Sequence, residues 1–433
     1  MNTFESIIGY EEIKYELRII ADVLKNTDKY KAFGVCAPRG LLLSGEPGVG
    51  KTLMANALIY ESGRKTFVCR KNMPDTDFTN HINKIFTEAK QNAPSIVFLD
   101  DIDKYANNDK DHKDASIFVT IQAMMDEIGD SEVFVIATAN EPEKLPDSLK
   151  REGRFEKTIE VYAAFGDEGK RVTAHYLEKT KSTDIKDMES ISKILEGKSC
   201  AAIQTLVNRA GIIAAYESAE SITDEHLIKA ILSGYYKVPE YLIDKKRQNL
   251  ENTTEKMRRI VYHEAAHATV SEVLSPGSVS LIAAYMNKND TVAFVTSNAN
   301  DDIPRIDNMY ISIVTALAGK AALRLKFGCN DTGVNKDLKG AFTTEKALIR
   351  CECVGGFNLR QGTISDVSEQ SKAALEQVGA FEAERLSMKA TEILVKNGIF
   401  FEKIANELAL KGYLVTRDID EIKSTCTITP VSI

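Results

Sequence analysis

Residues 40–60 read GLLLSGEPGVGKTLMANALIY, and this stretch decides the fold of the first part of the chain. A short apolar run leads into GEPGVGKT at 45–52, and a helical sequence follows it directly. The octapeptide fits the pattern G-x-x-x-x-G-K-[ST], which forms a phosphate-binding loop when it lies between a strand and a helix. Both flanking segments are present, so the stretch predicts a nucleotide-binding α/β domain.

The predicted loop places several favourable groups around the phosphates of a nucleotide. Its glycines let backbone N–H groups approach phosphate oxygens closely, and the N-terminus of the following helix adds partial positive charge. Lys51 is expected to neutralise the β and γ phosphates, and Thr52 to ligate Mg²⁺. We therefore predict that ATP or ADP binds, with Mg²⁺, at Gly45, Glu46, Pro47, Gly48, Val49, Gly50, Lys51, Thr52 and Leu53.

Apolar runs alternate with helical segments over the first 165 residues. Strands separated by helices predict a parallel sheet covered on both faces, and continuously apolar strands fit burial on both sides. Residues 1–165 are therefore expected to form a nucleotide-binding α/β domain. The runs occupy 40–45, 66–70, 95–100 and 133–139, and the helical segments occupy 51–62, 78–92 and 114–128.

Polar side chains follow the later strands of this predicted sheet. The strand in SIVFLDDID, 95–103, ends in Asp100, expected to hold Mg²⁺ through water, and Asp101, expected to polarise the attacking water. Asn140 ends the next strand and is expected to orient that water. Arg151 and Arg154 follow; in a ring of subunits they would reach a neighbour's γ phosphate, although two loop arginines taken alone are usually solvated surface.

The remainder of the chain is predicted to be mainly helical. Residues 166–238 lack strand-like runs and are expected to form a small helical lid, with a helix beginning near Thr223. Residues 239–255 are polar and charged and are interpreted as a linker. Residues 256–433 are expected to form a third, mainly helical domain with a short strand pair around 279–296.

A second motif, HEAAH at 263–267, lies in the helical sequence RRIVYHEAAHATVSEVL. His263 and His267 are one helical turn apart and face the same way, so both imidazoles can ligate one Zn²⁺. Glu264 is next to them and is expected to act as the general base toward a water at the metal. The motif predicts a zinc peptidase, against the simpler reading of two surface histidines flanking an acid.

A catalytic zinc needs a third protein ligand. No histidine follows His267, so this ligand must be a carboxylate or a cysteine. Spacing alone cannot choose among the candidates, which include Asp290, Asp301, Asp302, Asp307, Cys329, Asp331 and Asp337.

The composition limits the kinds of binding partner and the cellular compartments that we expect for this chain. A net charge of −8 argues against nucleic acid, because nucleic-acid partners usually call for a basic patch. No apolar run reaches the roughly 20 residues that a membrane helix needs. The seven cysteines are odd in number and scattered, which fits a reducing compartment better than a disulfide framework. We therefore expect a soluble, cytoplasmic chain without a membrane segment.

The two motifs together make the chain resemble the FtsH family of AAA+ proteases over nearly its full length, apart from that family's membrane segments. The shared order is phosphate loop, acidic strand, GRF arginine loop, helical lid and an HEAGH-type helix, here YHEAAHA with Ala266 in place of glycine. This resemblance implies that Asp337, in TGVNKDLKGA at 332–341, is the third zinc ligand. It also implies adenine contacts from Ile8 and Gly9, a nucleotide contact from His175, and a homo-hexameric ring that threads unfolded or tagged protein substrates.

The chain departs from this family pattern at several positions. Asp101 stands where the family has glutamate, and its shorter side chain is expected to slow ATP hydrolysis. The family's aromatic-hydrophobic-glycine pore triplet is missing from CRKNMPDTDFTNH at 69–81, where Met73 or Phe78 would be the substitute grip or simply packing residues.

Three functions follow from these observations. The leading one is an ATP-dependent zinc endopeptidase that unfolds and threads its protein substrates. The second is a zinc peptidase that acts on loosely folded chains and has a weakly coupled or regulatory ATPase. The third is a non-proteolytic AAA+ remodelling chaperone with a structural zinc, against which the intact set of His263, Glu264 and His267 argues.

Overall fold

The structure is a computed structural model, and it describes residues 3–34, 38–71, 73–106, 115–129, 131–180, 182–286, 291–298, 305–329, 335–352 and 369–433. Contacts group the chain into two compact units. Unit 1 comprises Met1–Thr183 and Leu195–Ile212, and unit 2 comprises Asp184–Ile194 and Ile213–Ile433. The segment 166–238, expected as a separate lid, is therefore divided between the two.

Unit 1 is built on a five-stranded parallel sheet with the order β2-β3-β4-β1-β5. Every residue of β1, β3 and β4 is buried, as their continuous apolar sequences predict. The predicted parallel sheet is confirmed, but β5 was not predicted because three of its four residues are exposed and it forms no apolar run. The strands are β1 Gly40–Ser44, β2 Lys65–Cys69, β3 Ser95–Leu99, β4 Val133–Ala139 and β5 Lys157–Glu160.

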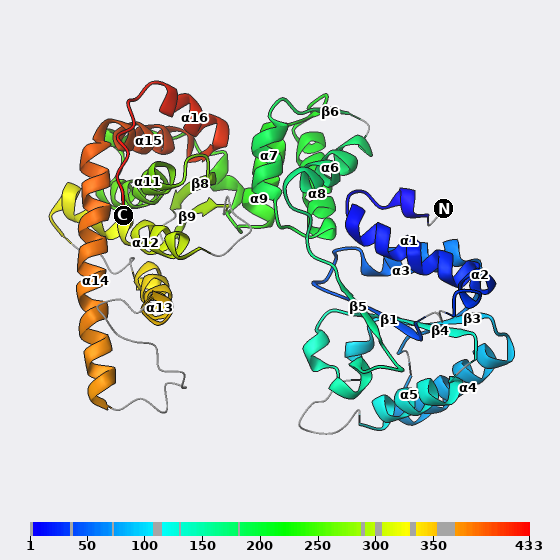
Figure 1. The fold of residues 1–433 in the computed structure, drawn as a ribbon. Helices are drawn as coiled ribbons and strands as arrows, with labels where there is room; N and C mark the ends of the chain where they lie inside the picture. The colour runs from blue at the N-terminus through cyan, green and yellow to red at the C-terminus, as the bar shows by residue number, and fades with distance from the viewer. Residues whose placement is uncertain are drawn as a thin grey trace. The chain divides into compact units, whose positions relative to one another are not determined.

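Helices cover both faces of this sheet (Figure 1). One layer contains α1, Glu11–Lys25, packed on α3, Lys51–Ser62; the other contains α4, Asp75–Gln91, and α5, Ala115–Ile128. Side chains of α4 and α5 share one buried cluster with β1, β3 and β4. The shorter helices of this part are α2 Thr27–Lys31 and the 3-10 turns Phe4–Ser6, Ile102–Lys104, Pro142–Lys144 and Asp147–Lys150.

Helices continue after the sheet. They are α6 Gly166–Glu178, α7 Met188–Leu195, α8 Cys200–Tyr216 and α9 Asp224–Gly234, with two-residue strands β6 Thr183–Asp184 and β7 Ile222–Thr223. The helix expected near Thr223 is α9, and Thr223 and His226 form its capping box.

The segment expected as a linker, 239–255, belongs to unit 2 and includes two short helical elements. It contains α10, Glu240–Ile243, and the 3-10 turn Leu250–Asn252. Arg247 lies with its guanidinium carbon 4.4 Å from the centre of the Tyr285 ring and donates a hydrogen bond to the carbonyl of Ala284. Leu242 and Leu250 are also buried. Because charged residues surround them in the sequence, the composition of the segment did not predict this burial.

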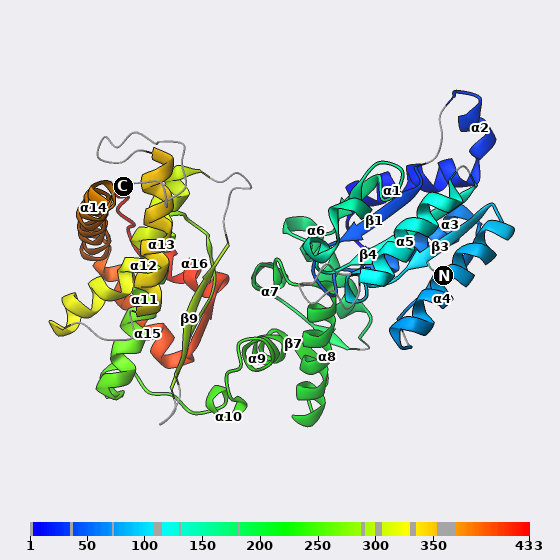
Figure 2. The ribbon, with the colours of Figure 1, turned by 90° about the horizontal axis from the view of Figure 1, so that it is seen from below.

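Unit 2 surrounds a central helix, α11, with other helices and a small antiparallel sheet. The sheet has the order β10-β8-β9, and β8 and β9 are the strand pair expected around 279–296. α12 lies beside both α11 and α13 (Figures 1 and 2). The elements are α11 Glu255–Leu274, β8 Val279–Met286, β9 Thr291–Ser297, α12 Ile306–Phe327, α13 Asn335–Glu352, α14 Glu369–Lys396, α15 Gly398–Lys411, β10 Tyr413–Val415 and α16 Thr416–Ser424.

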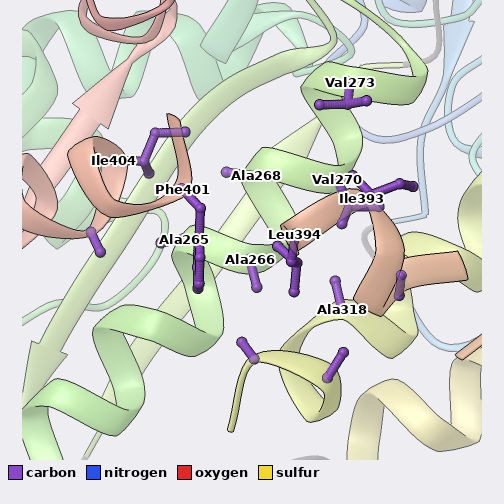
Figure 3. Close-up of a cluster of buried hydrophobic side chains, with 14 of the residues drawn as sticks. Ala265, Ala266, Ala268, Val270, Val273, Ala318, Ile393, Leu394, Phe401 and Ile404 are labelled. Carbon is purple, nitrogen blue, oxygen red and sulfur yellow. The ribbon is translucent and has the colours of Figure 1, made fainter. Parts of the chain in front are cut away.

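The core of unit 2 explains how α11 is held. Its alanines at 265, 266 and 268 are fully buried among side chains of α12, α14 and α15 (Figure 3). Small residues let neighbouring helices approach closely, and Phe401 and Leu394 fill the space that they leave. None of the described helices combines the length and the apolar character that crossing a membrane requires.

Candidate nucleotide and metal sites

The phosphate loop joins the end of β1 at Ser44 to the start of α3 at Lys51. Gly45, Gly48 and Gly50 have φ values of +140°, +82° and +106°, a region that favours glycine. A Cβ on Gly45 would lie 2.1 Å from the carbonyl oxygen of Val161, so no side chain fits there. The backbone of the loop therefore requires the glycines of the motif.

Lys51 is almost completely buried, at 5% exposure, and its ammonium group is fully hydrogen-bonded. Its Nζ donates to the carbonyls of Gly45 and Glu46 at 2.7 and 2.8 Å and to Oδ1 of Asn140 at 2.8 Å. Burial lowers the pKa of Lys51, although the carboxylates of Asp101, Asp103 and Asp100 act in the opposite direction. The ammonium therefore has strong partners that a phosphate would have to replace.

A cavity of about 520 Å³ adjoins the loop within unit 1. Among the predicted nucleotide contacts, Ile8, His175 and loop residues 47–53 line it, whereas Gly9, Gly45 and Glu46 do not. Sequence reasoning missed further lining residues: Tyr10, which precedes α1, and four residues supplied from far along the chain by α6, its C-terminal end and α8, namely Tyr176, Lys179, Cys200 and Gln204. The volume is within the range of small-molecule sites.

The ends of β3 and β4 bring Asp100, Asp101 and Asn140 to one place beside Thr52. Asp100 Oδ1 accepts hydrogen bonds from the hydroxyls of Thr52, at 3.1 Å, and Thr138, at 2.9 Å. Asp101 adopts a left-handed backbone with φ of 53°. Its carboxylate accepts from Asn140 Nδ2 at 3.2 Å and pairs with Lys104 Nζ at 2.5 Å.

The two predicted arginine fingers differ in their surroundings. Arg154 forms a two-pronged ion pair with Asp126, at 3.0 Å from Nε to Oδ1 and 2.9 Å from Nη2 to Oδ2, and also donates to the carbonyl of Ser148. Arg151 is exposed on the same loop. Arg154 is thus held by its own chain, and Arg151 is the more accessible cation.

Both substitute grip residues considered in the segment 69–81 pack inside unit 1. Phe78 is completely buried, and its ring meets Tyr105 edge to face with centroids 5.1 Å apart. Met73 is half-buried against the same cluster. This arrangement favours the packing interpretation of the two residues over the grip interpretation.

Three predicted metal ligands meet in unit 2. Oδ2 of Asp337, on α13, lies 3.0 Å from His263 Nε2 and 3.6 Å from His267 Nε2, and the two Nε2 atoms are 3.0 Å apart. Within the described ranges, this is the one cluster of three or more possible metal ligands. Of the other candidates, Asp307 and Cys329 are not in the cluster, while Asp290, Asp301, Asp302 and Asp331 fall outside the described residues.

The surroundings fit a bound divalent cation. His267 Nδ1 lies 2.7 Å from the carbonyl oxygen of Thr315, so Nδ1 carries the proton and the lone pair of Nε2 faces the cluster. One turn later on α12, a Cβ on Gly319 would lie 2.3 Å from Cε1 of His263. The glycine thus leaves the space that the His263 ring occupies. Two imidazole nitrogens and a carboxylate are a donor set that zinc prefers.

Sequence reasoning missed Thr315 and Gly319. Thr315 acts through its backbone carbonyl, which any residue would supply, so its sequence identity carries no signal. The only available signal for Gly319 was a glycine in the interior of a predicted helix, where glycine is unfavourable unless packing requires it.

Charge and burial are closely linked at the cluster. Burial raises the pKa of Glu264, which lies in a position 7% exposed, while the two histidines lower it and Asp337 raises it. Burial is the largest single influence on the pKa of Asp337 and acts to raise it, but the hydrogen bonds and the charge attraction of His263 and His267 together lower this pKa well below its usual value. Asp337 therefore stays ionised and supplies an anionic oxygen to the cluster.

Comparison with known proteins matches both halves of the chain. Residues 41–163 match the family described as "ATPase family associated with various cellular activities (AAA)". The ATP-dependent zinc metalloprotease FtsH of Pelobacter propionicus is 29% identical over 378 residues, which cover 83% of this chain and 59% of that protein. FtsH 1 of Alkaliphilus metalliredigens is 28% identical over 446 residues, covering 97% and 73%, respectively.

Further relatives show the same pattern. The ATP-dependent zinc metalloprotease FtsH of Borreliella burgdorferi is 28% identical over 456 residues, which cover 97% of this chain and 69% of that protein. The chain spans little more than half the length of some relatives, such as the one from Pelobacter propionicus. The resemblance inferred from the two motifs is confirmed: the chain is similar to FtsH-type ATP-dependent zinc metalloproteases over most of its length, and residues 41–163 match the AAA family.

Proposed function

We propose that this chain is an ATP-dependent zinc endopeptidase that acts on protein substrates. The observation that carries the proposal is the meeting of His263, His267 and Asp337, whose donor atoms lie within 4.8 Å of one another beside buried Glu264. The relatives are ATP-dependent zinc metalloproteases, which supports the same chemistry. The nucleotide cavity in unit 1 supports the ATP-dependent part.

In the peptidase half, each residue of the cluster has a separate task. Zinc bound at the three donors would polarise the scissile carbonyl and lower the pKa of a water molecule. His267, oriented by Thr315, and His263, seated against Gly319, present Nε2 atoms to the cation. Glu264 would accept the proton of the attacking water at its carboxylate and deliver it to the leaving amine.

In the ATPase half, Lys51 and Thr52 are proposed to bind phosphate and Mg²⁺, and Asp100 to hold Mg²⁺ through water. Asp101 and Asn140 lie 3.2 Å apart at one edge of the sheet and would orient the attacking water together. The remaining predicted nucleotide contacts keep their proposed roles. Those at the cavity, Ile8 and His175, have the stronger support.

The assembly is proposed to be a homo-hexameric ring that takes up unfolded or tagged proteins. In such a ring an arginine of one subunit would reach the nucleotide of the next. Arg151 is the better candidate, because Arg154 is already paired with Asp126. We also retain the division into a nucleotide-binding domain, helical lid, linker and peptidase domain as a proposal for how the ring is organised.

A second function has specific support: a zinc peptidase whose ATPase is weakly coupled or regulatory. The Asp101 carboxylate is paired with Lys104, which opposes its use in activating water. Phe78 is buried in the core and so is not displayed toward a substrate. The third function, a remodelling chaperone with a structural zinc, has no use for a buried carboxylate at position 264.

The first experiment tests the peptidase. Glu264→Gln should abolish cleavage of casein, an unfolded substrate, because the amide cannot accept the proton. Glu255→Gln is the matched control, since it makes the same change at an exposed position of the same helix, and it should leave cleavage unchanged. Undiminished cleavage by the Glu264→Gln protein would remove the proposed mechanism.

The second experiment separates coupled from uncoupled function. Casein and a folded, tagged protein are each supplied with and without ATP, to the wild type and to Lys51→Ala. Threading predicts that the wild type degrades the folded substrate only with ATP and that Lys51→Ala does not degrade it. If the wild type leaves the folded substrate intact under all conditions while cleaving casein, the uncoupled function is favoured.

A further inference from the structure

Arg70 directly follows the last residue of β2, and its guanidinium group lies on the carboxylate of Asp100. The Nε and Nη2 atoms are 3.0 and 2.9 Å from Asp100 Oδ2. These are short, charge-assisted contacts in the forked geometry that makes arginine a strong partner of carboxylates. The Arg70 side chain is 62% exposed and that of Asp100 only 12%, so the pair lies at the border between the site and solvent.

Asp100 has no acceptor capacity left in this arrangement. Its Oδ1 accepts from the hydroxyls of Thr52 and Thr138, and its Oδ2 accepts both contacts from Arg70. An ionised carboxylate has about four lone-pair positions, two on each oxygen. The two threonine hydroxyls can remain while a cation binds nearby, so Oδ2 is the oxygen through which Asp100 would hold a Mg²⁺-coordinated water.

A guanidinium group and a divalent cation compete for the same place. Both are positive, and at a few ångströms they repel each other strongly in a partly buried site. The other nearby cations already have partners: Lys104 pairs with Asp101, and Lys51 donates to two loop carbonyls and Asn140. Arg70 is therefore the group that neutralises Asp100, and the one that a metal ion would have to displace.

We propose that Arg70 is a positioning residue that neutralises Asp100 and must leave it before Mg²⁺ can bind there. The inference rests on the proposed nucleotide function. Because Arg70 begins the segment that runs on to Met73 and Phe78, its displacement would link metal–nucleotide binding to the connection between β2 and α4. Arg70 thus sets how strongly nucleotide binding depends on Mg²⁺, without touching the nucleotide itself.

The test compares the dissociation constant of fluorescent ADP in excess EDTA with that in saturating Mg²⁺, for the wild type and Arg70→Gln. Without Mg²⁺, the variant should bind ADP more weakly, because an unneutralised Asp100 repels the phosphates. With Mg²⁺, it should bind equally or more tightly, because no ion pair has to break. In Arg70→Gln, the ratio of the dissociation constant in EDTA to that in Mg²⁺ should therefore be at least about fivefold higher than in the wild type. This size is expected for the loss of a partly exposed, charge-assisted contact.

Two further variants control this measurement. Lys84→Gln removes one positive charge from an exposed site on α4, where Nζ lies 3.9 Å from the carboxylate of Glu88, and should leave the ratio unchanged. Arg70→Lys keeps the charge but loses the fork, and should give an intermediate ratio. The thermal unfolding temperature of each variant should stay close to that of the wild type.

Other results would overturn the inference. A ratio within about twofold of the wild-type value in Arg70→Gln would show that Arg70 does not compete with Mg²⁺. Equal weakening in EDTA and in Mg²⁺ would instead show that Arg70 contacts the phosphates directly. If the wild type itself binds no ADP under either condition, the proposed nucleotide function fails, which is a separate result.

Discussion

At the scale of the residue, the geometry of the metal cluster depends on groups that cannot ligate a metal. His263 and Glu264 lie next to each other in the helix, but the position of the His263 ring is fixed by the missing side chain at Gly319. His267 is oriented by the backbone carbonyl of Thr315, which lies on α12 together with Gly319. α12 is therefore a supporting surface for both histidine ligands, and its contacts should affect metal affinity.

Gly319→Ala provides a direct test of this support. Its Cβ would lie 2.3 Å from Cε1 of the His263 ring, so the ring must leave its present position. Zinc affinity, measured by competition with a chromophoric chelator, should fall about 10- to 100-fold, as is typical when groups that orient a ligand are disturbed. Casein cleavage should fall at limiting zinc.

The matched control is Gly340→Ala in α13. This glycine is also within a helix, but a Cβ there would meet nothing within 4 Å. The variant should keep its zinc affinity and gain up to about 1 kcal/mol in unfolding free energy from better helix propensity. If both alanine variants keep wild-type zinc affinity, the role assigned to Gly319 is wrong.

The residues of the site differ in how far sequence could predict them. His263, Glu264 and His267 follow from spacing within one helix, because helical geometry places positions four apart on one face. Asp337 is 74 residues from His263, and spacing left it among several candidates until the family resemblance singled it out. The ion pairs of Arg70 with Asp100 and of Arg154 with Asp126 join residues that are distant in sequence, so no local sequence pattern predicts them.

At the scale of the element, long apolar strands were predictable and short ones were not. β1, β3 and β4 are buried along their whole length, and their sequences are therefore continuously apolar, which makes them recognisable as strands. β5 and β10 have four and three residues and are defined by pairing with β1 and β8. Such pairing partners are distant in sequence, and no periodicity can develop over so few residues.

The connection between β2 and α4 gives a prediction that separates packing from substrate handling. Because Phe78 is fully buried against Tyr105, Phe78→Ala should lower the free energy of unfolding of unit 1 by about 3–5 kcal/mol. Denaturant unfolding measures this loss. Asp77→Ala, at the exposed neighbouring position, should have little effect on stability. A stable Phe78→Ala protein that fails only with folded substrate would restore the grip interpretation.

At the scale of the whole molecule, the proposed ring predicts complementation between two inactive variants. Lys51→Ala lacks a working phosphate loop but keeps Arg151, whereas Arg151→Ala keeps the loop but lacks the exposed arginine. In a mixed ring, the intact phosphate loop of an Arg151→Ala subunit would lie next to the intact Arg151 of a Lys51→Ala subunit. ATP hydrolysis should therefore be near zero for each variant alone and recover on mixing.

The control for complementation replaces the first partner with the Lys51→Ala, Arg151→Ala double variant. It contributes neither group, so mixing it with Arg151→Ala should restore nothing. Equal hydrolysis in both mixtures would mean that Arg151 does not act between subunits. When Arg154→Ala replaces Arg151→Ala in the mixture, ATP hydrolysis should not recover to the same extent. Loss of the ion pair with Asp126 also disturbs the subunit that carries the substitution.

The three metal donors are divided between two helices, α11 and α13, that are far apart in sequence. A zinc ion bound by both helices would cross-link them in addition to its proposed catalytic role. The unfolded chain would offer no such preformed binding site. The thermal resistance of unit 2 would then follow the free zinc concentration. Above the dissociation constant, each tenfold increase in zinc would add about 1.4 kcal/mol. Scarcity of zinc would thus do more than remove the proposed peptidase activity, because it would also leave unit 2 less resistant to unfolding.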